Sequence, residues 1–287
     1  MKFRFVQEHR ETFRVGKMCE VLKVSRSGFY AWLDRQPSRR VLEDETISVQ
    51  VRKAHREAHG IYGSPRIYRL LRQQGQSWGR HRIARIMREE GLKARCTKQF
   101  HWISTTRSEQ PAAPDLLQRE FSSSRRDRVW VGDVTQLRTG EGWLYLAMLM
   151  DLHSRKIVGW STSSTPRQEI TLEALTMAVE TRRPRPGLIH HTDRGGQYSS
   201  AAYQDLLDEY GMRCSMSRPG QCLDNAAAES FFHTLKTEWI YHAHYKTRRE
   251  ARLAIFEYIE SFYNTIRLHS SLDYRSPEEY ERLRSAA

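Results

Sequence analysis

The feature that most constrains the fold is a change of hydrophobic pattern near Arg128. Before it, apolar residues recur at helical spacing, and after it short apolar runs typical of strands appear. Three of these runs follow one another directly, and helices and strands then alternate. We expect strands at Val129–Leu137, Gly142–Leu152, Lys156–Ser161, Gly187–Thr192 and Met212–Met216, and helices at Gln168–Arg182, Ser200–Tyr210 and Asn225–Ile240. Three consecutive strands favour an antiparallel meander, whereas helical crossovers favour parallel pairing.

This order of elements is typical of a ribonuclease H-like core, which has a five-stranded mixed sheet with flanking helices. We therefore predict an α/β fold with this core over residues 125–242, followed by a helical tail over 243–287. In the tail, Thr247 and Glu250 form a capping box that opens a helix extending through Phe262. A last short helix is expected at Ser276-Pro277.

Small all-α units that resemble helix-turn-helix domains are expected ahead of the core. Residues 14–34 read as two short helices around a tight turn, with Ser25 capping the second. Arg26 and Ser27 would then begin a recognition helix, where contacts to bases are made. We assign residues 1–40 to this DNA-binding segment.

Residues 45–100 are expected to form a second, three-helix DNA-binding domain. Two of its helices are predicted to have serine N-caps, Ser64 followed by Pro65 at the first helical position, and Ser77. The candidate DNA contacts on these helices are Arg66, Arg69, Arg82 and Arg85. A solvated helical bundle is the alternative. Residues 101–124 are rich in Ser, Thr, Pro and Gln and read as a linker.

The distribution of charge favours a nucleic-acid partner for the first part of the chain. The formal net charge is +13. Residues 1–124 contain 25 Lys and Arg against 13 Asp and Glu, a net of +12, whereas residues 125–287 contain 22 against 21, a net of +1. A polyanion such as DNA is therefore expected to bind mainly before the core.

The composition argues against a membrane or metal-ribbon protein. The longest apolar run, Trp143 to Met150, is too short to span a bilayer, and Met1 to Arg10 has no signal-peptide core. The four cysteines are scattered and include no Cys-x-x-Cys pair, so neither a disulfide framework nor a zinc ribbon is expected. We expect a soluble, cytoplasmic protein.

Three carboxylates occupy positions that favour metal chemistry. Asp133 lies within an expected apolar strand, Asp193 follows the end of another, and Glu229 stands in the first turns of the Asn225 helix. Asp151 also ends a strand, but we assign it to turn formation. Because the chain has 34 acidic residues, three of them could be selected by chance. The assignment of these three as metal ligands therefore depends on their spacing and on the sequence around them.

Three converging carboxylates would repel one another without cations. Two divalent ions about 3.5–4 Å apart would relieve that repulsion and provide phosphoryl-transfer chemistry. We expect Mg²⁺, with Mn²⁺ as a substitute, held by Asp133, Asp193 and Glu229.

The sequence around these acids resembles the DDE transposase and retroviral integrase superfamily. The resemblance rests on Trp-Val-Gly-Asp-Val-Thr at Asp133, on His-Thr-Asp-Arg-Gly-Gly-Gln-Tyr at Asp193, and on Asp-Asn-Ala-Ala-Ala-Glu-Ser-Phe-Phe at Glu229. Thirty-five residues separate Asp193 from Glu229, which is that superfamily's interval. Lys236, seven residues later, matches its basic residue that contacts terminal DNA, and we expect it on the rim of the site.

The tail narrows the resemblance to the OrfB product of IS-three-family insertion sequences. It contains Tyr263-Asn264-x-x-Arg267-x-His269-x-x-Leu272, followed by Ser276-Pro277-x-x-Tyr280. The likeness covers essentially the whole chain, although nothing here matches the zinc module that precedes the core in integrases.

The resemblance implies a transposase that cleaves DNA at insertion-sequence ends and transfers the freed 3′-hydroxyl to a target. It implies double-stranded terminal repeats and target DNA as partners, a homodimer or higher assembly on DNA, and a bacterial, nucleoid-associated location. It also implies OrfA as a fusion or partner, because no sustained heptads provide a dimerisation element in this chain. The alternatives are a metal-dependent nuclease of the same fold and a DNA-binding repressor.

Overall fold

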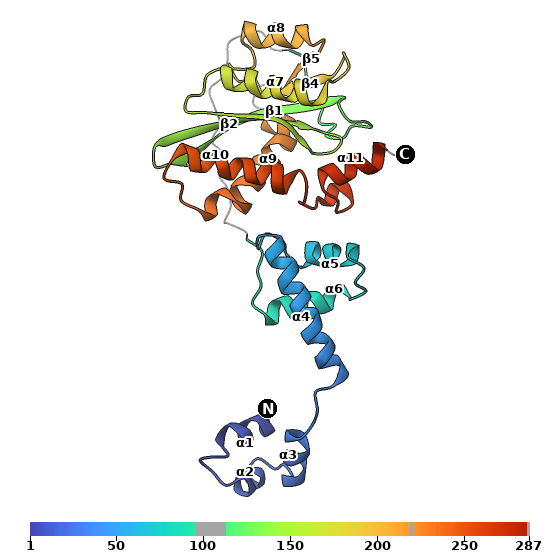
Figure 1. The fold of residues 1–287 in the computed structure, drawn as a ribbon, viewed down its shortest axis with the longest axis vertical. Coiled ribbons are helices and arrows are strands. Elements are labelled where there is room, and N and C mark those ends of the chain that lie inside the picture. The colour runs from blue at the N-terminus through green and yellow to red at the C-terminus, as the bar shows by residue number, and fades with distance from the viewer. Residues whose placement is uncertain (96–112, 219–220, 286–287) are drawn as a thin grey trace.

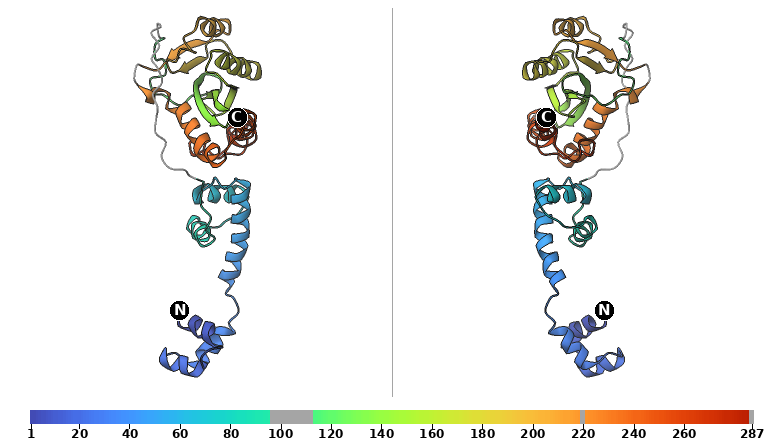
Figure 2. Two further views of the ribbon diagram at one scale, coloured as in Figure 1. Left: turned by 90° about the vertical axis from the view of Figure 1, so that its left-hand side faces the viewer. Right: turned by 90° about the vertical axis from the view of Figure 1, so that its right-hand side faces the viewer.

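The computed structural model describes residues 1–95, 113–218 and 221–285. Figure 1 shows three bodies arranged along one long axis, two of them helical and the third an α/β body that carries the C-terminus. The two side views in Figure 2 show the same order. No helix in the described ranges is both long and apolar enough to cross a membrane.

The first body contains α1 (Lys2–His9), α2 (Val15–Val21) and α3 (Arg26–Leu33). Its small core consists of Val6, Met18, Cys19 and Phe29. The Ser25 side chain accepts a hydrogen bond from Gly28 N, which confirms the expected cap. Helix α1 was not expected, since Val6 is its one fully buried side chain and leaves little apolar periodicity to detect.

The second body contains α4 (Arg39–Glu57), α5 (Ser64–Gln73) and α6 (Arg80–Glu89). The expectation that Ser64 and Ser77 cap the last two helices is wrong. These helices start after Gly63 and Gly79, which provide no side-chain cap. A proline is tolerated anywhere in the first turn, because the amides there have no helical partner, so Pro65 does not discriminate between these starts.

The third body is built on the predicted five-stranded mixed sheet, and its strand order is β3-β2-β1-β4-β5. The strands are β1 (Val129–Thr139), β2 (Gly142–Asp151), β3 (Ile157–Ser163), β4 (Ile189–Thr192) and β5 (Arg213–Met216). The first three pair antiparallel, and β1, β4 and β5 pair parallel. This register sets Val131 opposite His191, so the end of β4 lies beside the first residues of β1, close to Asp133.

Helices cover both faces of this sheet (Figure 1). Helices α7 (Glu169–Arg182) and α8 (Ala201–Glu209) pack on the face that includes Trp130. On the opposite face lie α9 (Ala226–Glu238), α10 (Arg248–Phe256) and α11 (Pro277–Ser285). Side chains alternate along β2, and both sets are buried because each face has its own helical layer.

Two turns bear out local expectations. The Thr247 hydroxyl accepts a hydrogen bond from Glu250 N, as expected for the cap. The Glu250 carboxylate accepts its hydrogen bond from Lys246 N, one residue before the N-cap position that a capping box uses. Beyond Phe256 the helix continues as a π-helical segment, Glu257–Tyr263, rather than as regular α-helix. Asp151 accepts a hydrogen bond from His153 N at 2.7 Å and so closes the turn after β2.

The second body packs directly on the C-terminal tail. The Tyr62 hydroxyl donates to Ile266 O at 3.2 Å and accepts from Leu268 N at 2.8 Å. Gln73 Nε2 donates to Tyr274 O at 2.8 Å. Residues 101–112, the first half of the linker expected at 101–124, lie outside the described residues, whereas the second half packs on the core through Leu117. The tail therefore makes a contact between the second body and the core that the sequence did not indicate.

Candidate active site

Asp133 enters the site from β1. The three residues before Gly132 pack into the sheet, and the carboxylate of Asp133 accepts a hydrogen bond from Val134 N at 2.8 Å. Burial raises the pKa of Asp133 well above its usual range, and the negative charges of Asp193 and Glu229 add to that rise. The ammonium of Lys236 acts in the opposite direction. A carboxyl group with this environment strongly favours a nearby cation.

Asp193 follows the last residue of β4, at the carboxyl edge of the parallel strands. Its Oδ1 accepts a hydrogen bond from Gly195 N at 2.9 Å, which forms the turn expected from Asp-Arg-Gly-Gly. Burial raises its pKa. A Cβ atom at Gly195 would lie 3.0 Å from that same oxygen, so a larger residue there would crowd the carboxylate.

Glu229 lies in the first turn of α9 and is partly exposed. Burial raises its pKa, and the charge of Asp193 adds to the effect. Each of the three carboxylates predicted from sequence is thus coupled electrostatically to at least one other. They come from one strand interior, one strand end and one helix start.

Lys236 does not lie on the rim, where the sequence placed it. The residue is 6% exposed, and its Nζ donates a 2.6 Å hydrogen bond to Thr135 Oγ1 in β1. Burial lowers its pKa to about 8, although the Asp133 charge favours the ammonium. Lys236 lies two helical turns after Glu229, on the face of α9 that packs on the sheet. Its side chain therefore extends to β1 and not to the solvent.

The donor set suits a hard divalent cation. Carboxylate oxygens are the ligands that Mg²⁺ uses in proteins. Asp133, Asp193 and Glu229 are near enough to interact electrostatically, and Lys236 is the nearby cation that opposes their repulsion. Within residues 1–95, 113–218 and 221–285, no three His, Cys, Asp or Glu side chains are grouped so that they could hold a metal ion in the conformations of this structure. The three residues therefore fit a metal site by the type of their ligand atoms and by the repulsion between their charges, which a bound cation would relieve.

Residues that the sequence analysis did not single out hold the start of α9. Asp224 is fully buried and accepts hydrogen bonds from Arg119 Nε at 2.7 Å and from Arg218 Nε at 2.9 Å. These two guanidinium groups hold the pKa of Asp224 far below its usual range. The Asp-Asn pair ahead of the helix was visible as part of the motif, but its arginine partners are distant in sequence.

The candidate DNA contacts fall into different environments. Arg26 and Ser27 are exposed at the start of α3, as predicted. Arg69 is exposed and lies over the Tyr274 ring at 4.9 Å. Arg66 instead points toward the core, where Nη1 lies 3.3 Å from Glu238 Oε1.

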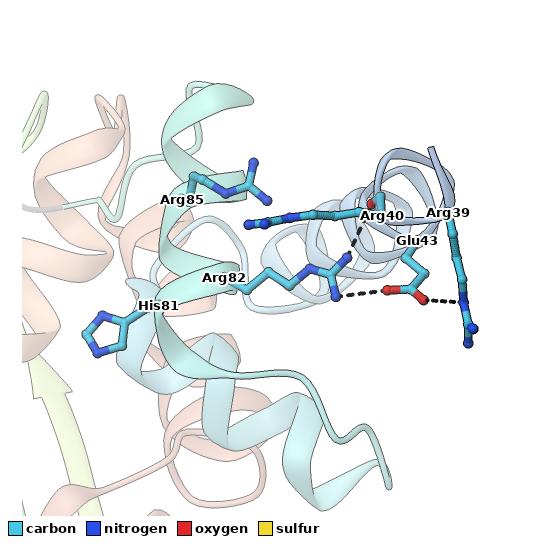
Figure 3. Close-up of a pocket in the computed structure, with 6 residues that line it drawn as sticks. All are labelled: Arg39, Arg40, Glu43, His81, Arg82 and Arg85. Atoms are coloured by element: carbon cyan, nitrogen blue, oxygen red, sulfur yellow. Dashed lines mark hydrogen bonds and ion pairs between the residues drawn. The ribbon is translucent and has the colours of Figure 1, made fainter. Parts of the chain in front are cut away.

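Arg82 and Arg85 line a cleft of about 730 Å³ between α4 and α6 (Figure 3). Arg82 Nε lies 2.7 Å from Asp44 Oδ1, and Arg85 Nη2 lies 2.6 Å from Asp44 Oδ2. Arg40 extends into the same cleft but forms no ion pair within the described ranges. The two arginines predicted as DNA contacts therefore hold α6 against α4, and Arg40 carries the uncompensated charge.

Comparisons with known families agree with this architecture. The integrase core domain family matches residues 123–222 and again residues 210–277. An HTH-like domain family matches residues 42–100, which is the second body.

The chain is also similar to curated proteins along nearly its full length. It is 41% identical over 284 residues to the "Transposase InsF for insertion sequence IS3A" of Escherichia coli (strain K12), covering 98% of each chain. It is 42% identical over 265 residues to the "Insertion element IS600 uncharacterized 31 kDa protein" of Shigella sonnei, covering 92% of this chain and 97% of that protein.

Among solved structures, the chain is similar to the catalytic core domain of HTLV-2 integrase in complex with magnesium. The TM-score is 0.42 at 16% identity, with 55% of this chain and 98% of that chain covered. A chain of the simian T-cell lymphotropic virus intasome in complex with PP2A regulatory subunit B56 gamma gives a TM-score of 0.46 at 14% identity, with 80% and 73% covered.

Proposed function

Because the chain belongs to the transposase family of IS3-type insertion sequences, we propose that it cleaves DNA at insertion-sequence ends and joins the freed 3′-hydroxyl to another strand. The single observation that carries this proposal is the convergence of Asp133 within β1, Asp193 directly after β4 and Glu229 in the first turn of α9, near enough for their charges to interact. Such a cluster at a sheet edge suits the binding of divalent cations and phosphate oxygens together.

The residues of the site have distinct parts in this proposal. Asp133, Asp193 and Glu229 would hold two Mg²⁺ ions, or Mn²⁺ in their place. When bound, the metal ions supply activation of the attacking oxygen and stabilisation of the leaving oxygen. Lys236 stabilises the charge of Asp133 from beneath and, through Thr135, fixes α9 against β1.

The two helical bodies are proposed to hold double-stranded DNA, both terminal repeats and target. The support is the charge distribution, a net of +12 before residue 125, together with the HTH-like match. The exposed Arg26 and Ser27 at the start of α3 remain candidates for base contacts. In the second body, Arg40 is better placed to meet phosphates than Arg82 and Arg85, whose charges are already paired.

Joining two DNA ends requires two active sites held together, so we propose a homodimer or larger assembly on DNA. An OrfA-type segment, fused or separate, is the proposed source of the dimerisation contact. The setting for this reaction is the bacterial cytoplasm, at the nucleoid, where the target DNA lies.

The test is a strand-transfer assay with paired end substrates in Mg²⁺. Asp193→Asn and Glu229→Gln are expected to abolish cleavage and joining while DNA binding persists, because each removes a charge without changing size. Near-normal joining by either variant would refute the metal-site assignment. Hydrolysis without any joining by the unaltered protein, with or without OrfA, would favour the alternative of a plain nuclease of the same fold.

A further inference from the structure

Asn225, immediately before α9, links the helix that carries Glu229 to the strand that carries Asp133. Its side chain is 3% exposed, and Nδ2 donates a 3.0 Å hydrogen bond to the carbonyl oxygen of Gly132. Gly132 is the residue directly before Asp133. The carboxamide therefore binds the peptide group that joins Gly132 to Asp133, the first carboxylate.

The same side chain is one helical turn from the third carboxylate. Asn225 is the N-cap residue of α9, and Glu229 follows four residues later in the first turn of that helix. The backbone of Asn225 is fixed in turn by its neighbour Asp224, which is held by Arg119 and Arg218. A displacement of Asn225 would therefore move Glu229 relative to Asp133.

Gly132 also determines how closely β4 approaches. A Cβ atom at Gly132 would lie 3.0 Å from His190 Cε1 and 3.3 Å from Thr192 Cγ2. Thr192 directly precedes Asp193. The peptide that accepts the Asn225 hydrogen bond is thus in contact with the strand that ends at the second carboxylate.

The arrangement carries an energetic cost that packing alone does not explain. The Oδ1 atom of Asn225 is buried and has no hydrogen-bond partner in the described structure. A buried acceptor without a partner destabilises a fold, so an apolar side chain of similar size would be the better choice if Asn225 only filled space.

We propose that Asn225 is a positioning residue that sets the separation of Asp133 and Glu229 required for binding divalent metal ions. This inference rests on the proposed function, because it assumes that those carboxylates hold the ions. Asn225 acts through the Gly132 carbonyl and α9, so its loss is expected to weaken metal binding more than it weakens the fold.

Asn264 provides a matched control elsewhere in the same domain. It is also 3% exposed, and its Nδ2 donates a 3.0 Å hydrogen bond to the carbonyl oxygen of Ile157 in β3. Its Oδ1 accepts a second hydrogen bond from Ile157 N at 2.9 Å. Asn264 therefore binds a strand backbone at least as firmly as Asn225 does, but on a strand without a candidate ligand.

The experiment measures the rise in melting temperature of the full chain as Mn²⁺ is added, without DNA, and the Mg²⁺ dependence of end cleavage. Asn225→Ala is expected to raise the Mn²⁺ and Mg²⁺ midpoints roughly tenfold or more, as removal of residues that orient metal ligands does. Asn264→Ala is expected to lower the melting temperature by as much or more and to leave both midpoints close to those of the unaltered protein.

The inference is overturned if Asn225→Ala keeps the unaltered midpoints, or if Asn264→Ala shifts them equally. If Asn225→Ala does not fold, Asn225→Ser and Asn264→Ser replace the alanine pair. Asp133→Asn distinguishes a failure of the metal site itself from a failure of the role given to Asn225. A lost Mn²⁺ response in Asp133→Asn with an unchanged response in Asn225→Ala rejects the role of Asn225 alone, whereas an unchanged response in both rejects the metal site as well.

Discussion

The ammonium of Lys236 donates a 2.6 Å hydrogen bond to the hydroxyl of Thr135, which lies two residues along β1 from Asp133. The contact places a buried cation within the electrostatic reach of the first carboxylate. It also ties α9 to the central strand, so Lys236 has a role in the fold as well as in the charge balance of the site.

The first prediction concerns the pH dependence of the reaction. Burial lowers the pKa of Lys236 to about 8, so its stabilising charge is lost as the pH rises through that value. End cleavage is therefore expected to decline above about pH 8. Lys236→Arg keeps its charge to higher pH and is expected to move the decline upward by about one unit or more. Single-turnover pH profiles of both proteins provide the measurement, and coincident alkaline declines would contradict this role.

The second prediction concerns acid destabilisation at His190. Its side chain is 1% exposed, its Nε2 lies 2.8 Å from the Tyr203 hydroxyl, and burial lowers its pKa to about 3. Between pH 6.5 and about pH 3, His190 is protonated in the unfolded chain but neutral in the folded chain. Stability from this residue is thus complete above about pH 6.5 and falls by about 1.4 kcal/mol per pH unit below it.

Urea unfolding measured at several pH values tests the His190 prediction. His190→Gln does not titrate, so its free energy of unfolding should fall less steeply between neutral and mildly acidic pH. His191, whose pKa burial also lowers, is present in both proteins and cancels in the comparison. Parallel pH dependences would show that His190 titrates normally in the fold.

The third prediction concerns the buried ion pair of Glu238 and Arg267. Both charges are largely buried and share two hydrogen bonds of 2.7 Å, and Arg66 from α5 reaches the same carboxylate at 3.3 Å. Arg267→Met leaves a buried carboxylate poorly compensated and is expected to cost about 3–5 kcal/mol of unfolding free energy. Arg66→Met removes a more exposed partner and is expected to cost about 1 kcal/mol or less. Equal losses in denaturant unfolding would contradict this ranking.

The fourth prediction concerns DNA binding by the second body. Arg40 points into the cleft between α4 and α6, whereas Arg82 is paired with Asp44 and Glu43. Arg40→Ala is expected to weaken duplex binding at low salt and to reduce the slope of log affinity against log salt by about one. Arg82→Ala is expected to leave that slope nearly unchanged and to lower thermal stability instead. Binding isotherms at several salt concentrations decide between them, and a larger slope change in Arg82→Ala would reverse the assignment.

The sequence by itself determined the features that repeat locally along the chain. The apolar runs of β1 and β2, the Ser25 and Thr247 caps and the position of Asp193 after β4 follow from patterns a few residues long. The mixed sheet follows from the order of those patterns, because consecutive strands form meanders and helical crossovers join parallel strands. The spacing of the three acids was likewise present in the chain.

Only the tertiary structure decided which charges are buried and which side chains meet. Lys236 and Thr135 are 101 residues apart, Arg82 and Asp44 are 38 apart, and Tyr62 and Ile266 are 204 apart. Contacts over such separations leave no periodic trace in the sequence. The sequence pattern of a lysine two helical turns after a carboxylate is the same whether the lysine side chain faces DNA or a strand. Lys236 faces the strand because of the way α9 packs on β1.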